Sequence, residues 1–299
     1  MKFFENALID RRTALKASLG MTLAGAVKGV PDCIVYGAGL EARKKMRLGL
    51  VTYMWGANWD IDTLIYNCHK AGLSGVELRT GHAHKVEPKL DVRARAAVKK
   101  RFADSPVQLV GLGCNEDFHD LDQDSLRLSI SIAKSFIKLS HDVGGSGVKV
   151  KPNDLPVEVA KEQTIEQIGR SLNELAVYAD GYGQQVRLEV HGGCARLPVI
   201  ASIMEIANHP NATVCWNSNP QDLEDGGLDS NFSLVKKRLG STIHVRQLND
   251  AVYPYTQLFK LLKQIVYDGW LLIEDSSPID DLAAAMARER DAFERLSAD

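Results

Sequence analysis

The amino-acid sequence predicts an α/β domain in which eight parallel strands, each followed by a helix, close into a barrel. From Met46 onward, short runs rich in Val, Ile and Leu alternate with longer segments of helical periodicity. Eight such units in about 250 residues is the size at which a parallel sheet closes into a (β/α)8 TIM barrel. An open doubly wound sheet is the rival, but no Gly-x-Gly-x-x-Gly follows the first run.

The eight expected strands are short and apolar, and most of them end next to polar or ionisable residues. They cover residues 48–54, 75–79, 108–112, 147–151, 186–191, 213–216, 242–247 and 271–274. The segments between them have the apolar spacing of helices that bury one face. These expected helices cover residues 62–70, 92–102, 126–143, 164–182, 198–207, 233–239, 255–265 and 280–296.

Glycine-bearing turns support these boundaries, because several expected helices end in one just before the next strand. Gly72, Gly144 and Gly269 occupy such turns. Glycine adopts the left-handed conformation that ends many helices without the steric cost that a Cβ atom brings. We therefore expect these glycines to cap the preceding helices.

The composition of the 299 residues, 45% hydrophobic and 25% charged, is that of a globular protein. The formal net charge of −2 leaves no basic face for a phosphodiester backbone, and no run of about eighteen apolar residues is present. We therefore expect neither nucleic acid as a partner nor membrane insertion of the mature chain. The oligomeric state, including a homo-oligomer, is left open.

Residues 1–46 differ from the rest of the chain. The pair Arg11-Arg12, followed by Leu15, Lys16 and a small apolar stretch, resembles a twin-arginine (Tat) export signal. We therefore expect residues 1–46 to be a signal and linker, residues 47–299 to be the catalytic barrel, and the destination to be periplasmic. The alternative is an ordinary amphipathic N-terminal helix on a cytoplasmic protein.

Ionisable residues recur near the carboxyl ends of the expected strands, where barrels of this kind carry their active sites. Side chains two apart on one strand face the same side, which pairs these residues within each strand. The pairs are Glu77 with Arg79, Lys149 with Lys151, Glu189 with His191, and His244 with Arg246. The alternate positions are apolar and suit the side that faces the helices.

Four groups at the ends of the last four strands are candidates to hold one divalent cation. They are Glu189, Asn217, His244 and Glu274. Burying a charged or imidazole side chain costs several kcal/mol unless something pairs with it, and a metal ion would offset that cost. Each residue alone is also explained by a hydrogen-bonded structural role. Four at matching positions favour a metal site.

The segments that carry these residues, LEVHG, VCWNS, IHVRQLND and LLIED, resemble the xylose isomerase-like barrel superfamily, the sugar phosphate isomerase/epimerase group. The resemblance runs from about Leu48 to the C-terminus. It implies that these residues hold Mn2+, Co2+, Mg2+ or Zn2+. Asn217 departs from the pattern, since relatives usually have Asp there. One negative charge fewer lowers affinity and favours hard ions, Mn2+ first and Mg2+ next.

The resemblance also implies an enzyme, a sugar isomerase or epimerase of carbohydrate metabolism. Glu189 and Glu274 would act as the two bases that remove and return a proton next to a carbonyl, through a metal-stabilised enediolate. One alternative is a lyase that uses the same proton abstraction for β-elimination on 3-keto-glycosides. Another is a non-catalytic sugar-binding barrel, with Asn217 as the sign of lost activity.

Six further residues are expected to bind the substrate: His191, Arg246, Lys149, Lys151, Trp55 and Glu77. His191 is suited to a hydroxyl, and Arg246 to a carboxylate, a phosphate or an oxyanion. The two lysines either polarise a keto oxygen or pair with acids, for which Glu77 and Glu189 are candidates. Trp55 offers a ring face to the sugar. His191 capping a turn and Arg246 neutralising a structural carboxylate are the structural alternatives.

Overall fold

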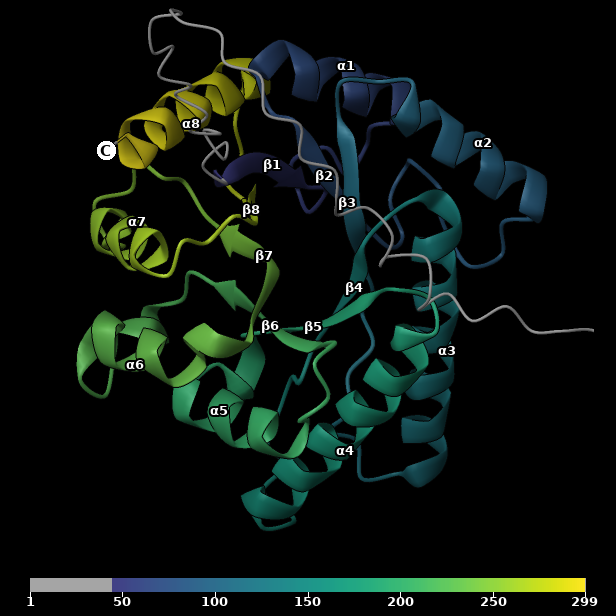
Figure 1. Ribbon diagram of the computed structural model, residues 1–299, viewed down its shortest axis with the longest axis vertical. Helices are drawn as coiled ribbons and strands as arrows, with labels where there is room; N and C mark the ends of the chain where they lie inside the picture. Colours follow the sequence, from purple (N-terminus) through teal and green to yellow (C-terminus); the bar gives the residue numbers. More distant parts are fainter. Residues whose placement is uncertain (1–44, 299) are drawn as a thin grey trace, which may run out of the picture. The chain divides into compact units, whose positions relative to one another are not determined.

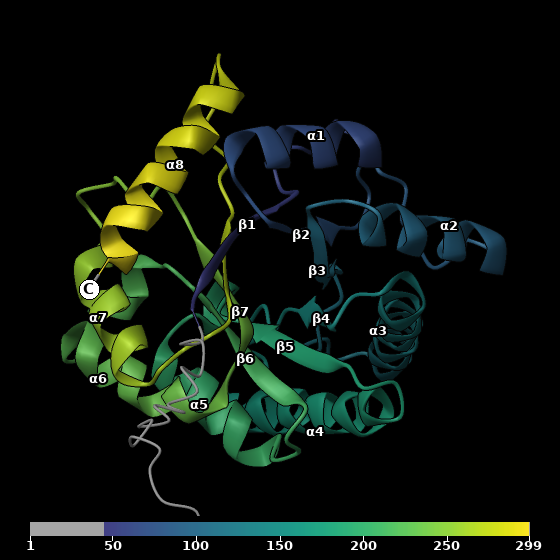
Figure 2. The same ribbon diagram turned by 45° about the horizontal axis from the view of Figure 1, so that its top comes forward.

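The computed structural model describes residues 45–298, which form a closed barrel of parallel strands in the order β1 to β8. The strands are β1 (Arg47–Val51), β2 (Gly75–Arg79), β3 (Gln108–Gly113), β4 (Gly147–Val150), β5 (Gln185–Glu189), β6 (Ala212–Asn217), β7 (Leu239–Val245) and β8 (Trp270–Ile273). Helices surround them on the outside (Figures 1 and 2). These are α1 (Ile61–Ala71), α2 (Val92–Ala103), α3 (Gln123–Val143), α4 (Lys161–Asp180), α5 (Leu197–Ile206), α6 (Gly227–Val235), α7 (Tyr255–Gln264) and α8 (Leu282–Ser297).

The predicted (β/α)8 TIM barrel is thus confirmed, with each expected strand found within a few residues of its place. One helix was placed wrongly. The expected helix at 233–239 is α6, Gly227–Val235, and a short 3-10 turn follows it at Lys236–Arg238. The start of α6 was missed because its N-cap is Gly226 in a left-handed conformation (φ 101°) instead of a side chain that accepts hydrogen bonds.

Two of the three predicted glycine caps are confirmed. Gly72 (φ 80°) and Gly144 (φ 91°) are left-handed and end α1 and α3. The expected cap at Gly269 is wrong, because α7 ends at Gln264 and the left-handed residue after it is Val266 (φ 53°). A Cβ atom at Gly269 would lie 2.3 Å from Tyr267 Oη. The glycine there serves close packing.

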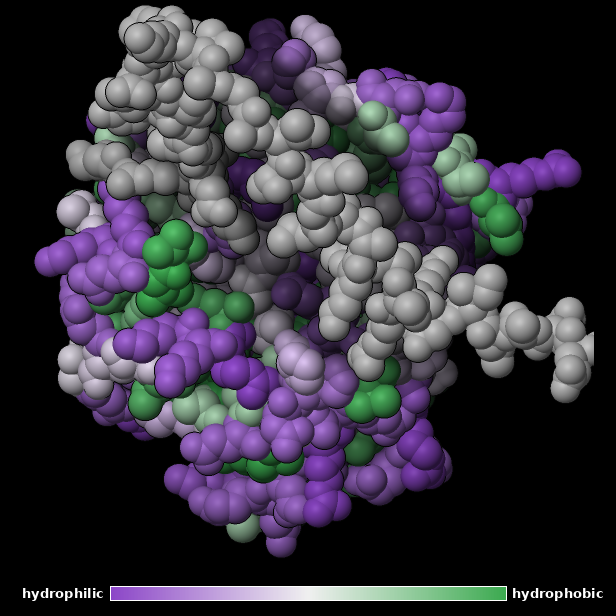
Figure 3. Space-filling view, viewed as in Figure 1, coloured by the Kyte–Doolittle hydropathy of each residue, from purple (hydrophilic) through white to green (hydrophobic). Residues whose placement is uncertain are grey.

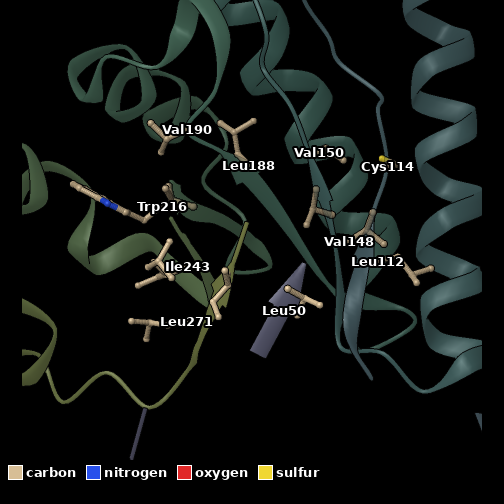
Figure 4. Close-up of a cluster of buried hydrophobic side chains, with 14 of the residues drawn as sticks. Leu50, Leu112, Cys114, Val148, Val150, Leu188, Val190, Trp216, Ile243 and Leu271 are labelled. Atoms are coloured by element: carbon tan, nitrogen blue, oxygen red, sulfur yellow. The ribbon is translucent and has the colours of Figure 1, made fainter. Parts of the chain in front are cut away.

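The two faces of the strands differ sharply in chemistry. The outward side chains are apolar and pack beneath the helices, as Leu50, Val148, Leu188 and Ile243 show in Figure 4. The inward side chains include five charged or imidazole groups that are at most 2% exposed: Glu77, Lys149, Arg187, Glu189 and His244. Four of these groups therefore form a polar layer toward the carboxyl ends of the strands, and Arg187 lies deeper.

Glycines make room for large side chains deeper in the barrel. A Cβ atom at Gly75 would lie 2.4 Å from the ring of Trp270, and one at Gly147 would lie 2.8 Å from the guanidinium of Arg187. Such approaches are closer than real Cβ contacts allow. Small residues on β2 and β4 therefore let a tryptophan and an arginine fill the floor beneath the polar layer.

The predicted export signal at residues 1–46 lies outside the described residues except for its last two. Among the helices of residues 45–298, none is long and apolar enough to span a bilayer. Hydrophilic side chains dominate the described surface in the view of Figure 3, with small apolar patches between them.

Candidate metal centre

Glu189 ends β5 and forms a buried ion pair with Lys149 of the neighbouring β4. The Lys149 Nζ atom lies 2.8 Å from Glu189 Oε2, and both side chains are 2% exposed. Burial alone would raise the pKa of Glu189, but the Lys149 ammonium and His244 outweigh it and hold that pKa well below its usual range. Burial likewise opposes the charge on Lys149, and Glu189 and Glu274 raise its pKa nonetheless. Both groups are charged.

His244 lies on β7 between carboxylates and is wholly buried. Its Nε2 atom is 3.2 Å from Glu77 Oε1 on β2. Its Nδ1 atom is 3.5 Å from Glu189 Oε1 and 3.4 Å from Glu274 Oε2. Within residues 45–298, Nδ1 has no hydrogen-bond partner of acceptable geometry. The ring therefore has one nitrogen occupied by Glu77 and the other directed at two carboxylates.

This arrangement fits a divalent cation. Glu189, His244 and Glu274 each offer one ligand atom, and these atoms all lie within 4.8 Å of one another. If Nε2–H is donated to Glu77, a lone pair on Nδ1 faces two carboxylate oxygens, which is unfavourable unless a positive charge lies between them. Ligand bonds of about 2.1 Å in tetrahedral geometry place neighbouring ligand atoms about 3.4 Å apart, close to the separations found here.

The electrostatics around His244 agree with this interpretation. Burial favours the neutral ring, yet Cys215, Glu274 and Glu77 together raise the pKa of His244 well above its usual range. The surroundings thus favour positive charge at the ring. Glu77 is itself wholly buried, and Oε2, its second carboxylate oxygen, has no partner within the described chain.

Two predicted site residues have positions that suit other roles. Glu77, expected to bind substrate, lies beneath the site and fits a partner that orients His244. Asn217, expected to bind the metal, ends β6 and its Nδ2 donates to Glu189 Oε1 at 3.1 Å. A ligand role would need the amide oxygen of Asn217 to turn toward the cation, so that role stays a prediction.

Three other predicted substrate-binding residues follow the strand ends at the mouth of the barrel. His191 Nδ1 lies 2.9 Å from Asn153 Oδ1, and Arg246 Nε donates to the carbonyl of Ser218 at 3.2 Å. Lys151 is half-buried and makes no ion pair with the described residues. Their contacts with a substrate stay predictions.

Trp55 lies in the loop after β1 and is only 3% exposed. Its Nε1 atom donates to the carbonyl of Ser277 at 3.1 Å. The ring also lines a cavity of about 330 Å³ together with Gln247, Ile279 and Glu289. A stacking role for Trp55 would have to use that cavity, because almost none of the ring faces open solvent.

A polar network that the sequence did not predict holds His191 in place. Asn153 Oδ1 accepts a hydrogen bond from His191 Nδ1, and Asn153 Nδ2 donates one to Asp117 Oδ2 at 2.7 Å. Asp117 also contacts His119 at 3.1 Å. Asn153 has a positive φ of 62°, which asparagine tolerates better than most residues, and this was the one local signal available.

Comparison with known proteins agrees with the fold. Residues 65–296 match the model of the family described as xylose isomerase-like TIM barrel. None of the curated proteins matches the sequence significantly.

Similar solved structures have the same barrel at low sequence identity. D-psicose 3-epimerase from Clostridium cellulolyticum H10, solved with D-tagatose, is 15% identical with a TM-score of 0.72, covering 84% of this chain and 99% of that one. The 3-keto-D-glucoside 4-epimerase from E. coli is 17% identical with a TM-score of 0.68 over 84% and 99%. The IOLI protein, solved with a zinc atom, is 16% identical with a TM-score of 0.72 over 84% and 98%.

Proposed function

The chain belongs to the xylose isomerase-like TIM barrel family, and from this premise we propose that it is a divalent-metal-dependent sugar isomerase or epimerase. The observation that carries the proposal is the buried His244, whose Nδ1 has no hydrogen-bond partner among residues 45–298 and faces one oxygen each of Glu189 and Glu274. A protein that only binds a sugar does not need two bases around one centre. Proton removal and return beside a carbonyl needs two bases.

A divalent cation at this centre would supply Lewis-acid polarisation of substrate oxygens. Glu189, His244 and Glu274 would hold it, with Asn217 as a further candidate, and Mn2+ is the ion we expect first. Glu77 would keep the His244 ring in orientation by accepting from Nε2. Zn2+ is the alternative, because the similar barrel of the IOLI protein was solved with a zinc atom.

The two glutamates differ in a way that suits unequal roles. The Glu274 side chain is 14% exposed and follows β8 at the mouth, whereas Glu189 is 2% exposed and paired with Lys149. Glu274 is therefore the base that a substrate reaches first. Lys149 keeps Glu189 ionised and therefore available as a base. Glu189 would accept a proton from the carbon of a bound substrate.

The test is wash-in of deuterium from heavy water into a panel of keto sugars, followed by NMR, with Mn2+ added and with chelator added. We expect exchange at the carbon next to the carbonyl only with the metal. A chain that binds these sugars without exchanging any proton would contradict the proposal and would favour the non-catalytic barrel.

β-Elimination on 3-keto-glycosides is the second candidate, because a similar structure is that of a 3-keto-D-glucoside 4-epimerase. Both reactions begin with the same proton abstraction. Incubation with a chromogenic 3-keto-glucoside separates them, since elimination releases the aglycone and epimerisation leaves the glycosidic bond intact.

We also propose a periplasmic destination, which rests on the pair Arg11-Arg12 with Leu15, Lys16 and the small apolar stretch after them. Fusion of residues 1–46 to a reporter that is active only after export tests it. Replacement of both arginines by lysine should abolish reporter activity, and unchanged activity would contradict a twin-arginine route.

A further inference from the structure

We propose that the substrate carries an anionic group, a carboxylate or a phosphate, which binds between Arg79 and Lys151 at the mouth of the barrel. This rests on the proposed function for the identity of the remaining substrate as a sugar. It adds a second subsite, on the β2 to β4 side of the barrel, opposite the strands that carry the candidate metal ligands.

The strand register brings three cations into one corner. Arg79 on β2 is level with Gly113 on β3, and Gly113 is level with Lys149 on β4. Lys151 follows two residues after Lys149 and therefore lies one step nearer the mouth. Gly113 has no side chain to separate these groups, and a Cβ atom there would lie 3.3 Å from Lys149 Cε.

Among the described residues, only Lys149 of the three cations forms an ion pair with an acid. Lys149 pairs with Glu189 at 2.8 Å. Within residues 45–298, neither Arg79 nor Lys151 makes an ion pair, although both are half-buried. Two unpaired cations in partial burial repel each other, and an anion between them would remove that cost.

Arg79 is held in place by neutral groups. Its guanidinium lies over the ring of Tyr53, 4.5 Å from the ring centroid, and Nη2 donates to Asn115 Oδ1 at 3.3 Å. Its Nε atom is buried and has no hydrogen-bond partner in the described chain. A guanidinium positioned without an acid, with a donor still free, is suited to a planar or tetrahedral oxyanion.

The acids near this corner have other contacts: Glu77 contacts His244, and the Glu116 carboxyl is hydrogen-bonded to Ser129. Asp117 accepts from Asn153 and contacts His119, and Glu189 is paired with Lys149. Burial disfavours the charge on Lys151, and the Lys149 and Arg79 charges add to this effect and lower its pKa, with Glu189 and Asp117 opposing. An anion bound beside Lys151 would therefore stabilise the charged form of this lysine.

The experiment compares three ketoses with one carbon skeleton by isothermal titration calorimetry on the metal-loaded full chain. D-fructose is neutral, D-fructuronate carries a carboxylate, and D-fructose 6-phosphate carries a phosphate. We expect at least one anionic ligand to bind about tenfold or more tightly than D-fructose, and the tighter of the two identifies the anion. Equal binding of all three would overturn the proposal.

Variants assign the effect to the two cations. Lys151→Gln and Arg79→Gln should each remove most of the preference for the anion, while Lys151→Arg should keep it and shows that the site still folds. Lys260→Gln, an exposed lysine on α7, is the matched control and should keep the full preference. A preference that survives both Gln variants would also overturn the proposal.

Deuterium wash-in measured on the same ketoses separates the two proposals. Exchange without charge preference would overturn the anionic subsite and leave the isomerase intact. Charge preference without exchange into any ligand would support the subsite and contradict the isomerase.

Discussion

The two sides of the barrel mouth differ in the groups that they contribute. The β5 to β8 side contributes candidate metal ligands, and these are Glu189, Asn217, His244 and Glu274. The β2 to β4 side contributes cations, and these are Arg79, Lys149 and Lys151. Contacts between Lys149 and Glu189 and between Glu77 and His244 join these groups across the two sides. A site of this kind suits a substrate that presents neutral oxygens to a metal and an anion to the opposite side.

Burial affects acids in this protein according to whether a cation lies beside them. Glu189 is buried against an ammonium, and its pKa lies well below the usual range. Asp222, in the turn after β6, is equally buried, but its hydrogen-bond partners Tyr253 and Asn219 are neutral; burial outweighs them and the Arg246 charge, and the pKa of Asp222 rises to about 7. The charge of a buried acid here is decided by its neighbour.

The largest expected effect is on the rate of deuterium exchange, from substitutions on the β5 to β8 side. Glu189→Gln and Glu274→Gln remove the proposed bases, and each should slow deuterium exchange by roughly 10²–10⁴-fold. Glu205→Gln, a substitution on the exposed surface of α5, is the control and should leave the rate unchanged. Exchange at the wild-type rate in either active-site variant would remove that glutamate from the mechanism.

The next effect breaks the contact between the two sides. Lys149→Met leaves Glu189 buried without its ammonium and should lower the free energy of unfolding by about 3–5 kcal/mol, measured by urea denaturation of the metal-free protein. Lys134→Met removes a surface ion pair with Glu174 of 2.6 Å and should cost about 1 kcal/mol or less. Equal losses of unfolding free energy in the two variants would show that the buried pair of Lys149 and Glu189 stabilises the fold no more than a surface ion pair does.

The pH dependence of stability tests whether burial raises the pKa of Asp222, in contrast to the lowered pKa of Glu189. Because its pKa rises from 3.8 to about 7 on folding, the folded state binds the proton more tightly, and this stabilisation is lost as pH rises through 7. Between pH 5 and pH 8 the wild-type should lose on the order of 2–3 kcal/mol of unfolding free energy relative to Asp222→Asn. Parallel pH profiles would mean that Asp222 titrates normally.

The smallest effect concerns the orientation of His244. Glu77→Gln keeps the shape of the side chain but removes the carboxylate that accepts from Nε2. Metal affinity, measured by competition with a chelating dye, should fall about 10–100-fold. Glu87→Gln, on a carboxylate in the loop after β2 that contacts Thr80 and Gly81, is the control. An unchanged affinity in Glu77→Gln would leave that residue with a purely structural role.

The repeating parts of this fold could be predicted from the sequence because they depend on local patterns. Each strand and helix repeats one apolar spacing, so the eight units and the barrel followed. The start of α6 escaped because Gly226-Gly227 is typical of a turn, not a helix start. Gly269 was misassigned because its small size serves the Tyr267 ring and not a helix cap.

The site was predicted only in outline, since its contacts join distant parts of the chain. The ends of the strands placed the ionisable residues at the mouth, and the Lys149 contact with Glu189 was among the alternatives. The contact between Glu77 and His244 spans 167 residues of sequence, and no local pattern indicates it. The same holds for the link from Asp117 through Asn153 to His191, which depends on three different loops.

The most direct test of the metal centre is a crystal structure of chelator-free protein with anomalous diffraction recorded at the absorption edge of the bound metal. We predict one divalent ion per chain, within about 2.3 Å of Glu189, His244 and Glu274, and no ion in His244→Ala. An empty centre in protein that still exchanges deuterium into keto sugars would contradict a metal-dependent reaction at this site.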